Sequence, residues 1–98
     1  MSFVLVVTPR AAEDAEEAAL WYDKQRKGLG EDFLLAVEAE LNSIARNPNQ
    51  YAIMRGQYRR AVVQRFPFGI FYAIENERII VFSVWHYKRK PFGWLRKK

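Results

Sequence analysis

The sequence predicts an α+β fold in which a helical hairpin packs on a mainly antiparallel sheet. Three observations predict it: an alanine- and acid-rich first half with apolar residues at helical spacing, an aromatic and β-branched half after Pro48, and one β-branched run before the helices. We expect the element order β-α-α-β-β-β within a single domain over residues 1–98, because a chain of 98 residues leaves no room for a second one.

Local sequence patterns place the first two elements. The short, β-branched segment Phe3–Val7 predicts a strand. Thr8 and Pro9 predict a helix start, since threonine caps free N–H groups and proline suits the first helical position. This helix runs through about Asp23, and its thin apolar face consists of Ala11, Ala15, Ala18, Ala19 and Tyr22. The glycines of Lys27–Gly30 end the helix and turn the chain.

A second helix is expected from about Glu31 to Arg46. One apolar stripe at helical spacing supports it, formed by Leu34, Val37, Leu41 and Ile44. The segment Asn47-Pro48-Asn49 ends this helix. Because the connection between the two helices is short and rich in glycine, we expect them to form an antiparallel hairpin.

The rest of the chain predicts strands. The runs lie near Tyr51–Met54, Tyr58–Phe66, Ile70–Glu75 and Arg78–Trp85. The predicted turns between these strands are Arg55-Gly56, Pro67-Phe68-Gly69 and Asn76-Glu77. The two-residue link Asn76-Glu77 predicts that the last two strands form a hairpin. The segment Pro91–Trp94 is too short for an element, but we expect its two aromatic side chains to fold back on the sheet.

Composition excludes several classes of function. The chain has no cysteine, which rules out disulfides, thiolate metal ligands and a cysteine nucleophile. With one histidine, His86, far from the acids of the helices, we expect no metal site. No apolar run approaches the ~20 residues of a membrane span, and no basic segment precedes Phe3–Val7, so we expect no secretory signal.

Charge divides the chain into two unlike parts. Residues 1–40 hold nine acids and four bases, whereas residues 41–98 hold two acids and twelve bases. Bases alternate with aromatic residues toward the C-terminus, which favours a polyanionic or acidic partner. A solvated basic face that binds nothing is the alternative.

The residues available for chemistry are cations, tyrosine and the histidine. No phosphate-binding glycine loop or serine nucleophile motif is present, and the remaining set is Arg59, Arg60, Arg65, His86, Tyr87, Lys88, Arg89 and Lys90. Such residues bind phosphates and are able to cleave RNA without a metal, with His86 or Tyr87 as acid or base and an arginine as the clamp on the developing charge. Alternatively, His86 ends a strand and only orients the tail.

Three segments and one tryptophan carry a family resemblance. The segments Arg65–Tyr72 (RFPFGIFY), Ile79–His86 and Arg89–Pro91, followed by Trp94, resemble the RelE/ParE toxin superfamily of bacterial type II toxin–antitoxin pairs, in its ParE-like, plasmid-stabilisation branch. The resemblance implies a cytoplasmic toxin without a cofactor that forms a hetero-oligomer with a small cognate antitoxin protein. The superfamily contains ribosome-dependent mRNA endonucleases and DNA gyrase inhibitors on one scaffold.

One departure separates these activities. RelE-like nucleases carry a basic residue where this chain has Gly69, and glycine has no side chain to clamp a phosphate. We therefore favour a non-enzymatic, ParE-like toxin that poisons DNA gyrase, with its target-binding residues in the basic tail, Lys88, Arg89, Lys90 and Trp94. The alternatives are a ribosome-dependent mRNA endonuclease, whose catalytic residues would be His86, Tyr87, Arg60 and Arg65, and a non-toxic orphan binding domain.

Overall fold

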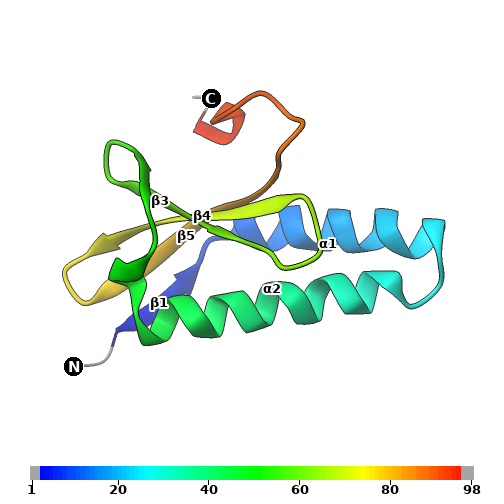
Figure 1. The fold of residues 1–98 in the computed structure, drawn as a ribbon, viewed down its shortest axis with the longest axis horizontal. Helices are drawn as coiled ribbons and strands as arrows, with labels where there is room; N and C mark the ends of the chain where they lie inside the picture. The colour runs from blue at the N-terminus through cyan, green and yellow to red at the C-terminus, as the bar shows by residue number, and fades with distance from the viewer. Residues whose placement is uncertain (1–2, 96–98) are drawn as a thin grey trace.

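Two helices and a five-stranded sheet make up the computed structural model, which describes residues 3–95 (Figure 1). Its elements are β1 Val4–Val7, α1 Pro9–Gln25, α2 Leu29–Arg46, β2 Ile53–Arg55, β3 Tyr58–Val62, β4 Phe68–Glu75 and β5 Arg78–His86, with 3₁₀ turns at Pro48–Gln50 and Gly93–Leu95. The α+β fold is confirmed. The order has one strand more than β-α-α-β-β-β, because β2 and β3 are separate strands of one small hairpin.

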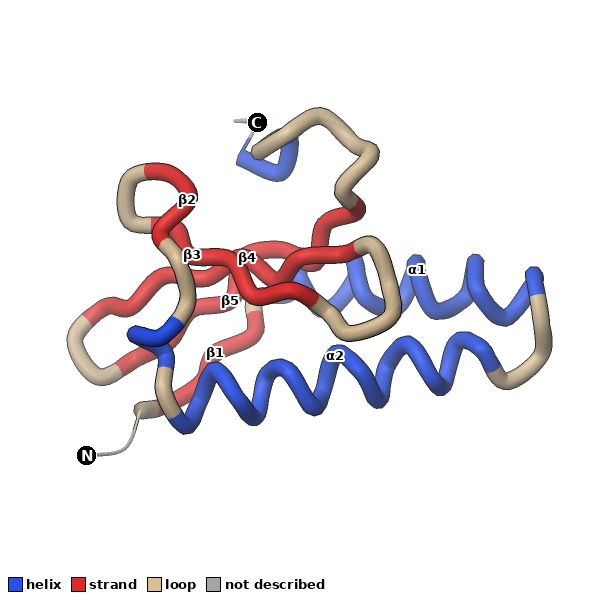
Figure 2. Tube along the Cα trace, viewed as in Figure 1, coloured by secondary structure: helices blue, strands red, loops and turns tan. Residues whose placement is uncertain are grey.

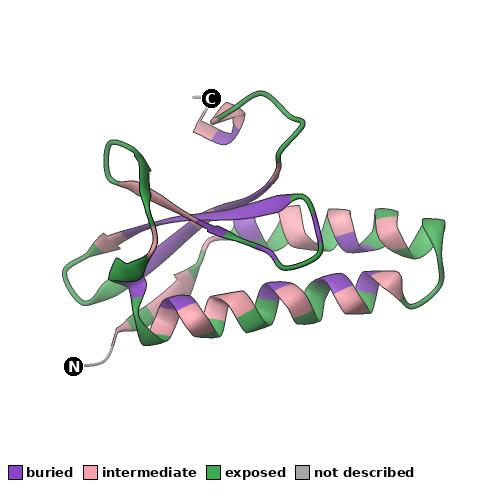
Figure 3. Cartoon of the chain, viewed as in Figure 1, coloured by how far each residue is buried: buried purple, intermediate pink, exposed green. Residues whose placement is uncertain are grey.

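The sheet lies between the helical hairpin and the C-terminal tail (Figure 2). Its strand order is β1-β5-β4-β3-β2, in which β1 runs parallel to β5 and the other neighbours are antiparallel. The first six residues of β4 are all buried (Figure 3). This burial on both faces explains why β4 is a nearly continuous apolar run rather than an alternating one.

Thr8 joins the first helix to the sheet. Its Oγ1 accepts a hydrogen bond from the Ala11 N–H at 3.2 Å and donates one to the Val81 carbonyl at 2.9 Å. The predicted cap is thus confirmed, and it also fixes α1 beside β5. On the buried side of α1, Ala11 and Ala19 present only methyl groups, so the helix lies close to its neighbours.

The second helix begins two residues earlier than predicted and buries a different residue. Gly28 is its N-cap at a positive φ of 91°, and Gly30 lies inside the helix. Leu34 is 41% exposed, whereas Phe33 is fully buried and packs against Phe66 and Phe68. Phe33, like Leu34, stands at helical spacing from Val37 and Ile44, so the periodicity fits either stripe and the aromatic contacts select Phe33.

The connection between β3 and β4 also differs from the prediction. β3 ends at Val62, and the chain turns over residues 63–67, where Arg65 has a positive φ of 73°. Phe68 and Gly69, predicted as part of the turn, lie in β4 opposite His86 and Trp85. Pairing with β5 extends β4 to these residues. The predicted β4–β5 hairpin is confirmed, with Glu75 opposite Arg78.

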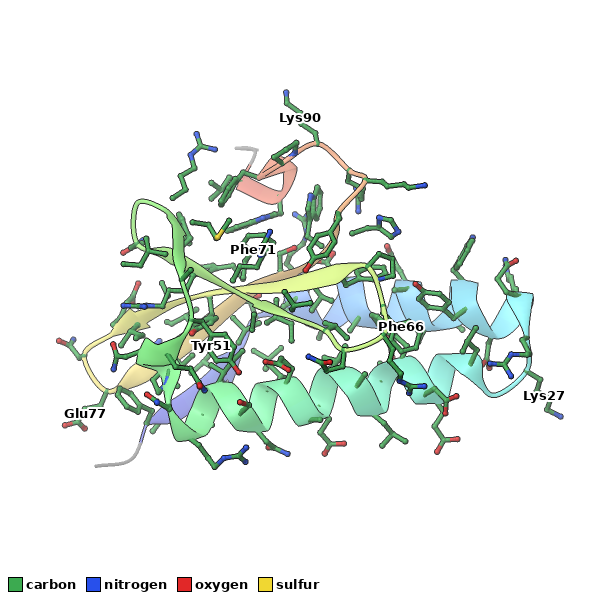
Figure 4. The ribbon with its side chains drawn as sticks, viewed as in Figure 1. Lys27, Tyr51, Phe66, Phe71, Glu77 and Lys90 are labelled. Carbon is green, nitrogen blue, oxygen red and sulfur yellow. The ribbon has the colours of Figure 1, made fainter. Side chains whose placement is uncertain are left out.

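The tail folds back on the sheet, as predicted, and forms a second core there. Trp94 is 7% exposed and packs against Phe71, Phe82 and Tyr58. Figure 4 shows Phe71 on the tail side of the sheet and Phe66 on the helix side. The cations Arg96, Lys97 and Lys98 lie outside the described residues.

Within residues 3–95, neither helix is apolar enough over sufficient length to cross a membrane.

Candidate functional site

The turn that follows β5 is held by three hydrogen bonds. His86 Nδ1 accepts from the Lys88 N–H at 2.9 Å, and the His86 carbonyl accepts from the Arg89 N–H at 3.1 Å. The Trp85 indole Nε1–H donates to the Lys90 carbonyl at 3.0 Å. An accepting Nδ1 places the proton of a neutral imidazole on Nε2. His86 therefore orients the turn through its ring nitrogen and its carbonyl, which is the structural role considered for it in the sequence analysis.

Two arginines beside this turn lie on aromatic rings. The guanidinium of Arg89 lies 3.9 Å from the ring centroid of Trp85, and that of Arg60 lies 5.3 Å from the ring of Tyr87. Neither has a carboxylate partner among residues 3–95, where Arg10–Asp14 is the one ion pair. The site therefore presents two ordered cations whose charge is not neutralised by the protein.

Gly69 forms the floor beneath one of these cations. A Cβ atom at this position would lie 2.9 Å from Cγ and Cδ of Arg60 and 3.3 Å from Cε1 of Tyr87. The stem of Arg60 and the ring of Tyr87 therefore rest on the bare backbone of β4. A side chain at position 69 would occupy the space that Arg60 fills from the neighbouring strand β3.

A pocket of about 230 Å³ brings most of the predicted residues together. It is lined by Arg60, His86, Tyr87 and Arg89, with walls from Met54, Phe71, Trp85, Pro91 and Phe92. Arg65 does not belong to this pocket; it is exposed in the turn before β4, with its guanidinium over Phe66 at 5.7 Å. Three of the four residues proposed for a nuclease thus meet, and the fourth lies apart.

The residues predicted to bind the target differ in their exposure. Lys88, Arg89 and Lys90 are exposed on the turn, and Figure 4 shows Lys90 at the outer edge of the tail. Trp94 is buried, so its ring anchors the tail and does not form the outer surface.

The protonation state of Tyr87 limits its chemistry. Burial raises the pKa of the Tyr87 phenol, and the positive charge of Arg60 opposes that shift. The phenol therefore carries its proton at neutral pH, which suits an acid or a hydrogen-bond donor and not a base.

Among the described residues, no three His, Cys, Asp or Glu side chains gather to hold a metal.

Sequence reasoning missed a second pocket on the helix side of His86. It measures about 380 Å³ and is lined by residues of α1 and β5 that include Trp21, Tyr22, Asp14 and His86. Asp14, on α1, accepts hydrogen bonds from Ser83 Oγ at 2.7 Å and the Val84 N–H at 3.2 Å. The adjacent Trp21 and Tyr22 were the available signal in the sequence. In the structure Trp21 is 58% exposed, which is unusual for so large an aromatic side chain.

Comparison with known proteins identifies the family. The model of the ParE toxin of the type II toxin–antitoxin system, parDE, matches residues 5–91. This chain belongs to the ParE toxin family. The matched range of this ParE family member includes both arginines and the turn after β5, and it ends before Trp94.

Two solved structures share the fold of this ParE family toxin. A chain of the chromosomal ParDE toxin–antitoxin system from P. aeruginosa superposes with a TM-score of 0.78 at 16% identity, covering 87% of this chain and 96% of that one. The YoeB dimer from Staphylococcus aureus gives a TM-score of 0.60 at 17% identity, covering 89% and 99%. No curated protein matches the chain in sequence. The family membership makes this chain a toxin of a type II toxin–antitoxin system, with an antitoxin as its partner.

Proposed function

We propose that this toxin acts in the cytoplasm on DNA gyrase, without cleaving RNA, and that its cognate antitoxin neutralises it within a hetero-oligomer. The observation that carries the proposal is the environment of Gly69. Glycine has no side chain, so position 69 itself offers no cation to a reacting phosphate, and the space above it is filled by Arg60 and Tyr87. Removal of one preorganised charge stabiliser typically costs ~10²–10³ in rate.

Two assays on the purified chain test the target. We expect inhibition of plasmid supercoiling by gyrase, relieved when the antitoxin is added first, and intact message in a translating lysate. Arg89→Ala should lose the gyrase effect, and Lys27→Ala, an exposed cation at the far end of the helical hairpin, should keep it. Discrete cuts in ribosome-bound message with normal gyrase activity would overturn the proposal.

One observation supports the nuclease as a second candidate. Arg60, His86 and Tyr87 line the same pocket, which supplies a cation, a ring nitrogen and a protonated phenol in one place. Such a site has the groups for metal-independent RNA cleavage, with Tyr87 as acid, although Arg65 lies outside it. Cleavage that is lost in Tyr87→Phe and retained in Arg65→Ala would support this candidate.

The charge distribution of the toxin supports an acidic antitoxin segment. Residues 41–98 carry ten more bases than acids, and the exposed part of that excess includes the turn after β5. Association steered by such charge is fast and slows as salt rises. Co-expression with the antitoxin should yield one stable complex; a chain that is recovered alone, soluble and harmless to its host would contradict this.

A further inference from the structure

We propose that the antitoxin adds a short parallel strand to β5 beyond the end of β1, and that two of its side chains enter the pocket of about 380 Å³ beside α1. The proposal rests on the cognate antitoxin of the proposed function and assigns it a place on this chain. Antitoxin binding is measurable without gyrase. An antitoxin that binds elsewhere on the chain therefore overturns this inference and leaves the proposed function standing.

The outer edge of β5 is covered over only part of its length. β1 pairs with β5 from Arg78 to Val81, and the last bond runs from the Thr8 N–H to the Val81 carbonyl at 3.1 Å. The chain then enters α1, whereas β5 continues to His86. Among residues 3–95, the end of β5 thus has β4 on one side and no strand on the other. An open edge of this kind is a template for a further strand.

The hydrogen-bond pattern identifies the backbone groups at this edge. The Tyr87 N–H donates to the Pro67 carbonyl at 2.9 Å, and bonded and non-bonded positions alternate along an antiparallel pair. Val84 and His86 therefore direct their backbone groups away from β4. The Val84 N–H donates to Asp14 Oδ2, and the His86 carbonyl accepts within the following turn. The Val84 carbonyl and the His86 N–H are left without a partner among residues 3–95.

These two groups match a parallel strand. In the existing parallel pair, Val4 lies opposite Arg78, and its N–H donates to the carbonyl of the residue before Arg78 at 2.8 Å. By the same pattern, one added residue opposite Trp85 bonds both the Val84 carbonyl and the His86 N–H. Main-chain bonds of this kind give affinity when a peptide joins a sheet edge. The added segment runs in the direction of β1.

The pocket beside α1 receives the neighbours of that residue. Side chains alternate between the two faces of a strand, so the residues before and after it share the face of Val84 and His86. There Trp21, Tyr22 and Phe68 form apolar walls. The volume of about 380 Å³ lies within the ~300–1,000 Å³ typical of ligand pockets. We therefore expect an apolar side chain on each side of the central residue.

The central residue meets positive charge on the opposite face. The guanidinium groups of Arg10 and Arg89 lie 5.6 and 3.9 Å from the ring centroid of Trp85. Arg10 binds Asp14 through Nε only. The expected segment is therefore an acid between two apolar residues. No described strand of this chain has that pattern, which favours the antitoxin over a second copy.

Amide hydrogen exchange, resolved by NMR, tests the added strand. It is measured on the full chain alone and in its co-purified complex with the antitoxin. We expect exchange of the His86 amide to slow about tenfold or more in the complex, because a hydrogen-bonded amide must open before it exchanges. The Lys27 amide, at the far end of the helical hairpin, is the control and should not change.

Two substitutions test the pocket by calorimetric titration with the purified antitoxin. Trp21→Ala removes a wall and should weaken binding about tenfold or more, as loss of an interface tryptophan does. Leu20→Ala is the matched control, since Leu20 is 64% exposed on the same helix and does not line the pocket; it should change binding less than twofold. Ala18→Leu fills the pocket and should also weaken binding.

Thermal denaturation of each variant keeps the test decisive. If Trp21→Ala lowers the melting temperature, Ala18→Leu decides the point in its place. Weak binding by Trp21→Ala with unchanged exchange at His86 would overturn the added strand in favour of a helix docked beside α1. Wild-type binding by both pocket variants would overturn the pocket as the site. Protection of His86 in the free chain that rises with concentration would overturn the proposal in favour of a second copy.

Discussion

Trp85 supports the exposed Arg89 in two ways. Its ring face lies against the guanidinium, and its indole N–H holds the Lys90 carbonyl, so the turn and the charge are fixed together. A cation–π contact at an exposed position contributes only ~0.5–1 kcal/mol. The arrangement therefore orders the cation, and it adds little to the stability of the fold.

This small contribution leads to a prediction for Arg89→Ala. We expect growth arrest to be lost when the variant is expressed, while the free energy of unfolding falls by less than about 1 kcal/mol and antitoxin binding persists. Growth curves and thermal denaturation of the same variant test it, with Lys27→Ala as the control. If Arg89 only braces the turn, toxicity should fall in proportion to the folded fraction; a variant that is fully stable and fully toxic would contradict both accounts.

At the scale of elements, the contact between the two helices depends on Gly30. A Cβ at this position would lie 2.4 Å from the Ala19 carbonyl oxygen, and the Gly30 N–H donates to Asp23 Oδ1 at 2.7 Å. The clash is with backbone, which no change of rotamer relieves. The close approach of α1 and α2, and with it the position of Tyr22 over the sheet, requires a glycine here.

Gly30→Ala should therefore destabilise the protein by about 1–3 kcal/mol, the usual range for overpacking. Alanine is the better helix former by ~1 kcal/mol, so helix propensity alone predicts the opposite sign. Glu38→Ala, on the exposed side of the same helix, is the control and should change stability little. Urea unfolding measures both variants, and a stabilised Gly30→Ala protein would show that the helices separate at no cost.

At the scale of the whole molecule, one buried tyrosine connects the sheet to the end of the helical layer. The hydroxyl of Tyr72, on β4, donates to the Pro48 carbonyl at 2.6 Å, and Tyr72 is fully buried. Burial raises the pKa of Tyr72 above its usual value, with a smaller opposing effect from the charge of Arg59. The folded state therefore holds this proton more tightly than the unfolded chain does.

This difference in proton affinity predicts alkaline instability. The contribution of Tyr72 is fully present below the unfolded tyrosine pKa of ~10 and is lost as pH rises from there toward the folded pKa. Tyr72→Phe should lose about 1–2 kcal/mol at pH 7, because the Pro48 carbonyl loses its donor, and its stability should then fall less steeply above pH 10. Urea unfolding between pH 7 and 11 tests this; parallel slopes for the two proteins would contradict it.

The sequence by itself determined the layers of this fold. The spacing of the alanines on α1, the cap formed by Thr8 and Pro9, and the turn at Asn76-Glu77 are local signals, set by hydrogen bonds and side chains within a few residues. These structural predictions held because each depends on neighbours along the sequence. The functional role of the motif that contains His86 and Arg89 stays a prediction.

Only the tertiary structure decided what depends on contacts between distant segments. Phe33 was chosen over Leu34 by the aromatic rings of the β3–β4 turn, and β4 was extended to Phe68 by its pairing with β5. The space above Gly69 is filled by Arg60 from another strand, which no local pattern encodes. Periodicity fixes which residues share a face, but the packing of remote side chains fixes which face is buried and which cations meet.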